Sequence, residues 1–385
     1  MSTPAKTSAS SAAIQKAVYH PEVVSLSVGG KVHSDWMGLW VDSDLKVPAD
    51  AFEFNLGLQH HGKLPADVRK GARVLVHIDG ELVMQGRIDA RTHKLSRVGG
   101  AAVHDVTLRG RDDAATLLDC SAPVKTTQKL TLVQVVEQIV KPLGIAQVRF
   151  LGDKQRTHDK VSVEPGETGA DVLDRACEAN GVAWWFDPNG VLVIGGPDYD
   201  APPVATLRLM YDNNLTNVEE VEEDDSIEGV YSELTVLGQS HGGKAGKGSN
   251  QKAVAKNPNI DWYRPKVVVD HDCQDVAMAA TRAKKLNADG HLGGYTLKVV
   301  VRGYYTEGGV LWKPGQRVEC DFEPFDTHAV FFLMARRFYV SRGGGGKYTL
   351  LTLKEDKAWV PEARKPKKAH KKARRVRKSI EKDLE

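Results

Sequence analysis

The chain has 385 residues, and its composition, 41% hydrophobic and 27% charged, is typical of soluble globular proteins with two or three domains. No apolar run approaches the roughly 18–20 residues that a membrane helix needs, and the N-terminus lacks the apolar stretch of a secretory signal. The four cysteines are about 40 to 100 residues apart without a C-x-x-C pair, which excludes the usual zinc motifs. Cys177 and Cys320 lie in apolar patterns and are predicted to be core residues.

Charge is concentrated at one end of the chain. Residues 363–385 contain eleven Lys/Arg and three Asp/Glu, a net charge of +8, so the first 362 residues carry −5 of the total of +3. A nucleic-acid enzyme would carry its basic residues on a folded face instead. This basic C-terminal tail is interpreted either as a solvated, disordered end or as a segment that binds nucleic acid or an acidic surface. Residues 1–18, small and polar, predict a flexible N-terminal arm.

The first folded region, residues 19–118, consists of short runs in which apolar and polar residues alternate. Residues 73–78 and 81–88 flank the dipeptide Asp79-Gly80, the strongest short hairpin signal in the sequence. This pattern predicts a first β-barrel domain of five or six strands.

The periodicity changes in residues 119–200. Thr131 with Gln134, and Thr168 with Asp171, have the spacing of helix capping boxes, and each pair precedes an apolar stripe of helical period. Two alternating runs follow the second stripe. We therefore predict an α+β domain with two helices, and strands at 182–186 and 191–194.

Strand patterns return in residues 201–362. A helical pattern at about 272–289, capped by Asp272 and ended by Gly290, interrupts them. The region is predicted to be a second β-barrel domain with a helical insertion, so the whole chain is expected to be a β-rich α+β protein. The strands expected here are 231–237, 295–301, 317–322, 330–340 and 348–353.

One segment of the first region is repeated in the third. Gly71–Ile78 and Gly315–Phe322 share the pattern G-x-R-V-x-(V/C)-x-(I/F), and each copy is followed by a second long strand. Each copy then ends in an alternating strand that is followed within four residues by acid. The repeat is either a chance similarity between two hairpins or a sign that one chain carries two copies of one barrel.

A duplicated barrel has a geometric consequence. Closed symmetric assemblies are the usual oligomers of soluble proteins. Three copies of a chain with two like barrels would present six similar barrels in a ring. Such a ring would fit a sixfold tube on one side and a threefold object on the other.

Three parts of the chain resemble the Mu-type phage baseplate hub family, the central hub of contractile tails, which is related to the base of the type VI secretion spike. The resemblance covers about residues 20–360 and is specific in combination rather than in any single motif. The stretches that carry it are Val106–Asp113 with Leu118–Ser121, Pro165–Asp174 with Gly181–Phe186, and Tyr231–Gln239.

The resemblance implies a structural protein that forms a homotrimer with two barrel domains and smaller domains between them. It implies contacts with the tail tube protein or a tube adaptor, the central spike and other baseplate proteins. It also implies a channel through which DNA passes without sequence recognition. Stable insertion of the protein into a membrane is not expected. On this hypothesis the protein is a late virion component assembled in the host cytoplasm. The arm and the basic tail lie outside the resemblance.

No catalytic, cofactor-binding or metal-binding residue is predicted. The loop Gly242–Ser249 lacks the spacing of a phosphate-binding loop. His60 and His61 are adjacent, so their side chains diverge on a helix or strand and favour a turn over a metal site. The sequence contains neither H-E-x-x-H nor G-x-S-x-G.

Acidic clusters leave one enzymatic alternative open. Asp112-Asp113 or Glu222–Asp225 would have to supply the paired carboxylates of a glycoside hydrolase. The segment Glu219–Glu228 is too uniformly acidic to bury, which favours a solvated face or a channel lining that repels DNA phosphates. Neutralising such a lining should slow genome ejection. The favoured hypothesis is the structural hub; the alternatives are a tail-tip cell-wall hydrolase and a type VI-like spike base.

Overall fold

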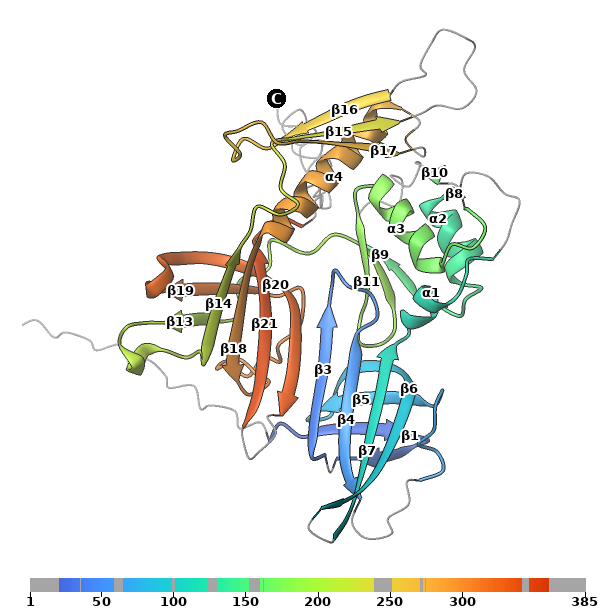
Figure 1. Ribbon diagram of the computed structural model, residues 1–385, viewed down its shortest axis with the longest axis vertical. Helices are drawn as coiled ribbons and strands as arrows, with labels where there is room; N and C mark the ends of the chain where they lie inside the picture. Colours follow the sequence, from blue (N-terminus) through green and yellow to red (C-terminus); the bar gives the residue numbers. More distant parts are fainter. Residues whose placement is uncertain are drawn as a thin grey trace, which may run out of the picture.

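The computed structural model of the chain describes residues 21–359, apart from 35, 59–64, 99–100, 124–129, 152–159, 162, 239–250, 271–272, 274 and 341–345. The predictions for the arm, the basic tail, the His60–His61 pair and the Gly242–Ser249 loop lie outside the described residues. The described chain is built from a large β-sheet, a small helical unit and a helix-backed three-stranded sheet (Figure 1).

Thirteen strands form the large sheet. Its main path runs β14-β18-β21-β20-β3-β4-β7-β6-β5-β1-β2, while β19 pairs with β20 and with β13. The strands are β1 (Val24–Val28), β2 (Lys31–His33), β3 (Gly38–Asp44), β4 (Ala51–Leu58), β5 (Arg73–Ile78), β6 (Glu81–Val98), β7 (Ala101–Asp112), β13 (Thr206–Leu209), β14 (Glu220–Asp225), β18 (Tyr295–Arg302), β19 (Arg317–Phe322), β20 (Thr327–Val340) and β21 (Lys347–Glu355).

Alternating burial explains why the repeated motif forms strands. Every second side chain of β5 and of β19 is buried, and these apolar residues belong to one core that both halves of the sheet share. The hairpin at Asp79-Gly80 is confirmed, with both residues at positive φ. The buried positions of the two strands are Val74, Val76 and Ile78, and Val318, Cys320 and Phe322.

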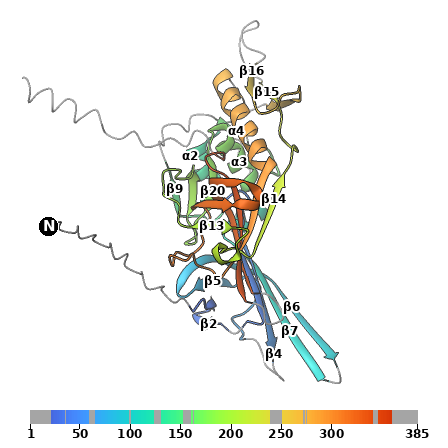
Figure 2. The ribbon, with the colours of Figure 1, turned by 90° about the vertical axis from the view of Figure 1, so that its left-hand side faces the viewer.

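The expected β-rich α+β class is confirmed. Among the described residues the strand pairings join both halves into one continuous sheet and close neither half into a ring. The link is the antiparallel pairing of β3 with β20, residues that lie about 300 positions apart in sequence. The long β6–β7 hairpin projects from the body of the molecule (Figure 2).

The unit between the halves contains both predicted capping boxes. Thr131 and Thr168 each accept from the backbone amide three residues on, and the side chains of Gln134 and Asp171 bond back. The elements of this unit are α1 (Ala115–Asp119), β8 (Leu130–Thr131), α2 (Leu132–Val135), the π-helical turn η1 (Val136–Val140), β9 (Val148–Phe150), β10 (Lys160–Val161), α3 (Gly169–Ala179), β11 (Ala183–Phe186) and β12 (Leu192–Gly195).

A third unit lies between β14 and β18. The expected helix bounds of about 272–289 were wrong: α4 runs from Val276 to Gly294 because Asp275 caps it and Gly290 does not end it. A side chain at Gly290 would collide with the Gly229 carbonyl, so this glycine permits a close backbone contact inside the helix. The helix packs on β15 (Glu233–Gly238) and β16 (Gln251–Lys256), and β17 (Pro265–Asp270) completes this three-stranded sheet by pairing with β15. Outside this unit, the described residues also form two short helical turns, η3 (Asn213–Leu215) and η4 (Glu323–Phe325).

Candidate assembly surface

The two halves of the large sheet repeat one strand topology. In the first module (β3–β7) the spatial order is β5-β6-β7-β4-β3, and in the second module (β14 and β18–β21) it is β19-β20-β21-β18-β14. Taken in chain order, the five strands of each module occupy the same places, and every neighbouring pair is antiparallel. The chance interpretation of the repeat does not account for five matching strands in one order.

Backbone contacts agree residue by residue. Gly71 and Gly315 both have positive φ, +79° and +95°, which favours glycine. The Gly71 amide donates to the Ile88 carbonyl at 2.7 Å, and the Gly315 amide donates to the Leu333 carbonyl at 2.8 Å. A β-bulge follows each acceptor residue in its pairing with the next strand. The repeat therefore extends to the irregularities of the sheet.

The arginine of each motif makes the same ion pair. Arg73 donates to both carboxylate oxygens of Asp113 at 2.6 and 2.8 Å. Arg317 donates to both oxygens of Asp356 at 3.0 and 2.5 Å, and also to the Ala201 carbonyl. The acid after each alternating strand was visible in the sequence, but its pairing with the arginine was not predicted. The similar separation of arginine and acid in the two copies, 40 and 39 residues, was the signal that would have found the pair.

An internal seam joins the modules, formed by Trp40–Asp44 of β3 against Ala335–Tyr339 of β20. Val41 and Phe338 lie opposite one another and are both fully buried. On the other face Arg337 donates to the Asp42 carboxylate at 3.0 Å. The seam is thus both an apolar contact and a charged cross-strand pair.

Buried charges lie beside this seam. Arg336 is 4% exposed and donates to the Val41 carbonyl at 2.9 Å; burial lowers its pKa to about 10. Burial raises the pKa of Asp50 to about 7, although the charge of Arg336 acts in the opposite direction. Burial also raises the pKa of Asp112 well above its usual range, with the charge of Asp50 adding to the effect.

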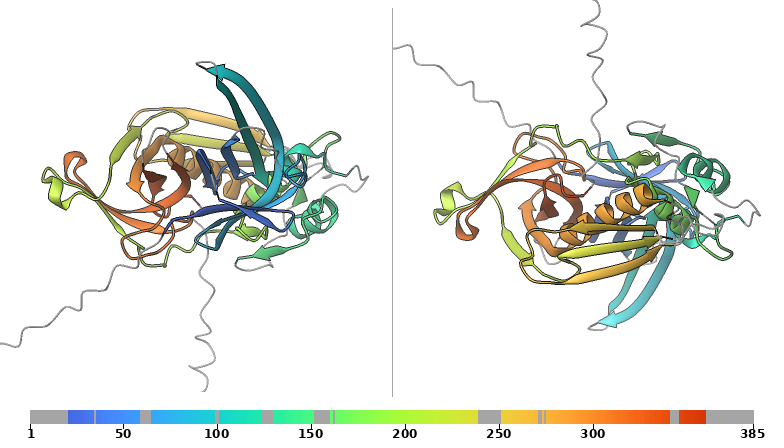
Figure 3. Two further views of the ribbon diagram at one scale, coloured as in Figure 1. Left: turned by 90° about the horizontal axis from the view of Figure 1, so that it is seen from below. Right: turned by 90° about the horizontal axis from the view of Figure 1, so that it is seen from above.

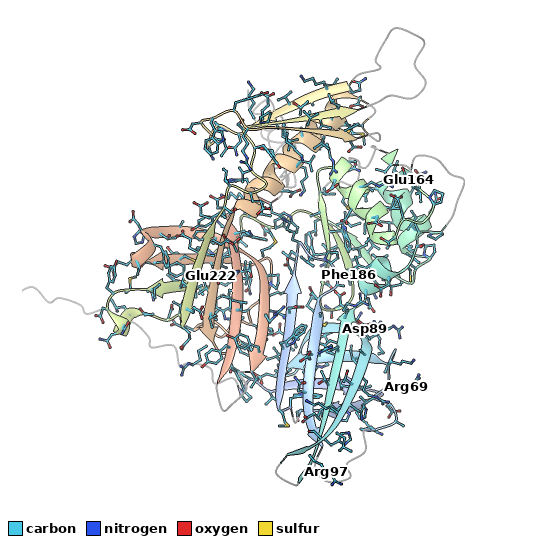
Figure 4. All side chains as sticks on the ribbon, viewed as in Figure 1. Arg69, Asp89, Arg97, Glu164, Phe186 and Glu222 are labelled. Carbon is cyan, nitrogen blue, oxygen red and sulfur yellow. The ribbon has the colours of Figure 1, made fainter. Side chains whose placement is uncertain are left out.

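The acidic strand β14 lies at the other end of the sheet. Glu220 and Glu222–Asp225 are exposed, as the sequence analysis expected for a solvated face. Two of them have polar partners: Lys298 forms an ion pair with Glu222 at 2.8 Å, and the neutral Tyr295 hydroxyl donates to Glu223 at 2.6 Å. Figure 4 shows Glu222 on this strand, on the far side of the molecule from the first module.

Four sequence families match successive parts of the chain. They are the Mu phage baseplate assembly protein GpP-like N-terminal family at residues 23–112, the baseplate hub protein gp44-like second domain at 114–196, the tail protein NMB1110-like third domain at 230–287, and a tail protein C-terminal domain at 289–358.

Known relatives match almost the whole chain. The crystal structure of a tail protein from Neisseria meningitidis MC58 is 37% identical, with a TM-score of 0.77, over 89% of this chain and 98% of that one. The baseplate hub protein gp44 of Escherichia phage Mu is 24% identical over 341 residues, 86% of this chain and 87% of the Mu protein. The chain belongs to the Mu-type phage baseplate hub family.

The resemblance seen in the sequence is thereby confirmed. A more distant likeness links the hub protein to an E. coli component of the type VI secretion system, at 13% identity and a TM-score of 0.53 over 85% of this chain and 76% of that one. That likeness concerns the fold. The relatives of the hub protein are structural tail and baseplate proteins, a role that is not enzymatic.

Two of the acids considered for a hydrolase, Asp112 and Asp113, are held by contacts within the fold of the hub protein. Asp113 is held by Arg73, and Asp112 is buried with one carboxylate oxygen accepting from the Ala114 amide at 3.0 Å. The cavity beside Asp50 and Asp112 measures about 10 Å³, room for no more than one water molecule. A sugar cannot enter it.

Within the described parts of the chain, no group of three or more His, Cys, Asp or Glu is placed to hold a metal ion. Cys177 and Cys320 are buried, as predicted, and so is Cys273. None of the described helices is both long enough and apolar enough to cross a bilayer.

The buried Asp50 should make the stability of the hub protein depend on pH. Its pKa rises from 3.8 in the unfolded chain to about 7 in the fold. Between these values only the unfolded chain releases the proton, so the free energy of unfolding should fall as pH rises, by up to about 1.4 kcal/mol per pH unit. Asp50→Asn keeps an oxygen for the Asp44 amide but removes the titration. Urea midpoints from pH 4.5 to 7.5 should therefore fall more steeply in the wild type than in the variant; parallel lines would contradict the assignment.

Proposed function

We propose that three copies of the hub protein form a ring of near-sixfold symmetry that connects the tail tube of a contractile phage to its central spike. DNA passes through the centre of this ring during genome ejection. The repeated module carries the proposal: three chains bring six modules of one topology, which suit a sixfold tube, whereas each remaining unit occurs three times and suits a threefold spike.

The partners follow from this position. They are the other two copies of the chain, the tail tube protein or a tube adaptor, the central spike and other baseplate proteins. The protein would then be part of the virion, assembled with the baseplate in the host cytoplasm late in infection. The names of the relatives, a baseplate hub and a tail protein, support this setting. DNA would meet the ring without sequence readout, consistent with the net negative charge of the first 362 residues.

A type VI-like spike base is the second candidate, supported by the fold shared with the E. coli type VI component. The two functions differ in the tube that the ring meets. Pull-downs of the purified protein with the phage tail tube protein and with a type VI tube protein would separate them.

The oligomeric state tests the proposal directly. Native mass spectrometry and light scattering of the purified chain should give a particle with three times the 42.1 kDa mass of one chain. The trimer should bind tail tube protein and should release no sugar from cell-wall sacculi. A stable monomer or dimer at micromolar concentration would contradict the ring, and hydrolysis of sacculi that is lost with one acidic substitution would favour the hydrolase.

A further inference from the structure

Several strand edges have no hydrogen-bonded neighbour among the described residues, and two of these edges belong to the repeated modules. The first is the outer edge of β14, which pairs only with β18. The second is the edge of β6 beyond Ile88, on the side where β5 ends. Unpaired edges are sites where another strand can add.

The repeated topology shows what belongs at these edges. In the first module the strand equivalent to β14 is β3, and in the second module the strand equivalent to β6 is β20. Within the chain, β3 and β20 pair with one another and form the internal seam. The free edges of β14 and β6 are therefore equivalent to the edges of β3 and β20, which pair with one another within the chain.

The strand registers convert this equivalence into residue numbers. Counted through β4 and β18, the seam residues Trp40–Asp44 correspond to Glu222–Ser226. Counted through β7 and β21, the seam residues Ala335–Tyr339 correspond to Ala90–Lys94. The β-bulge that follows Ile88, and its counterpart after Leu333, fixes this register without ambiguity.

We propose that β14 of one copy pairs in antiparallel fashion with β6 of the next copy, in the register that joins β3 to β20 within the chain. This inference rests on the proposed trimer and names the surface that closes it. The second module of each chain would then pair with the first module of the next chain, in the same way as the two modules pair within one chain. Internal seams and subunit seams would alternate around the six modules. Such a contact is heterologous and leads to a closed ring when the rotation per module is one sixth of a turn.

The charges of the two edges are complementary in this register. Two pairs of opposite charge would form, Lys94 opposite Glu222 and Arg91 opposite Asp225 of the neighbouring copy. Opposite charges on directly paired residues stabilise antiparallel strands, whereas a shift by one residue would place each side chain on the wrong face. The internal seam has a charged pair of the same kind, Arg337 with Asp42.

Burial gives an independent argument. At the internal seam Arg336 and Phe338 are 4% and 0% exposed, while their equivalents Arg91 and His93 are exposed. Leu95, the next residue after His93 on the same face of β6, is 73% exposed. Continuation of the register places Val221 of the next copy opposite it. The pairing would cover an apolar side chain that a single chain leaves in water.

The two edges do not pair within one chain. β14 and β6 are seven strands apart in the order of the sheet, and no pairing joins them. Figure 4 shows Glu222 on β14 and Arg97 on β6 on different sides of the molecule, and Figure 3 shows the β6–β7 hairpin directed away from the body. A covalent link between these edges therefore reports a neighbouring copy.

Cysteine pairs test the register in the full-length chain. In a Cys120→Ser background, which removes the exposed thiol, Thr92→Cys is combined with Asp224→Cys, and separately His93→Cys with Glu223→Cys. Two pairs are needed because only alternate cross-strand positions bring Cβ atoms close enough for a disulfide. After oxidation with copper phenanthroline, at least one pair should give covalent dimers and trimers but nothing larger on non-reducing gels.

The matched control combines Thr92→Cys with Glu223→Cys, one residue out of register, and should give about tenfold less product. Each single-cysteine chain should give none alone, and a mixture of the two should give dimers only. A trimer by mass without in-register cross-links would overturn the seam and leave the proposed function standing. A monomer without cross-links would overturn both, and cross-linked chains longer than three would exclude the closed ring.

Discussion

Replacing Arg317 by Met should lower the free energy of unfolding by about 3–5 kcal/mol, because it leaves a buried carboxylate without its counter-ion. Arg317 and Asp356 each expose only 14% of their side chains, and the guanidinium also donates to the Ala201 carbonyl. Methionine retains much of the apolar volume, so the loss reports the charge and its hydrogen bonds rather than a cavity. Urea denaturation followed by tryptophan fluorescence, at one protein concentration, measures the change.

The repeated module provides the control. Arg73 makes the same bidentate pair with Asp113, but the Arg73 side chain is 45% exposed. The Asp113 carboxylate is 13% exposed and keeps a hydrogen bond from the Gln85 side chain at 3.2 Å when the arginine is replaced. Arg73→Met should therefore cost about 1 kcal/mol or less, as is usual for an ion pair in contact with water. Equal losses in the two variants would show that burial does not decide the strength of this motif.

Gly110→Ala should cost about 3 kcal/mol, the upper end of the range for overpacking a filled core. Gly110 lies on β7 between β4 and β6. A Cβ atom there would collide with the Arg87 carbonyl and the ring of Phe52. The carbonyl belongs to a strand paired on both sides, so it cannot move away cheaply. The variant should unfold at lower urea concentration, or accumulate in the insoluble fraction.

Gly293 on α4 is the matched glycine. A Cβ atom at this position meets nothing within 4 Å, and alanine favours the helix over glycine by up to about 1 kcal/mol. Gly293→Ala should leave stability unchanged or raise it slightly. A comparable loss in both variants would contradict the close strand contact as the cause of the Gly110→Ala loss.

Much of the local structure was determined by the sequence alone. The capping boxes at Thr131 and Thr168, the turn at Asp79-Gly80 and the alternation in both G-x-R-V motifs depend on residues a few positions apart. Interactions of this range follow from side-chain type and spacing. The family resemblance also came from such segments, and the comparisons confirmed it.

Other features of the third unit were missed for a physical reason. One strand and a helix were predicted in this unit, whereas β16 and β17 were not. Both of these strands have exposed valines, such as Val254 and Val267. An exposed apolar position disrupts the alternation by which a half-buried strand is identified. The end of α4 was misplaced because Gly290 serves a tertiary backbone contact, which its neighbours in sequence do not reveal.

Only the tertiary structure decided how the repeated modules are joined. Backbone hydrogen bonds between strands are nearly independent of side-chain identity, so nothing in β3 or β20 alone specifies their pairing across some 300 residues. The partner of Arg317 and the charges that come to lie beside Asp50 depend on that same arrangement. The sequence determined that a module occurs twice. The fold determined which edges join the two modules and which edges remain unpaired and open to a neighbouring copy of the chain. Strand pairing depends on twist, bulges and core shape, which arise only when the whole sheet is formed.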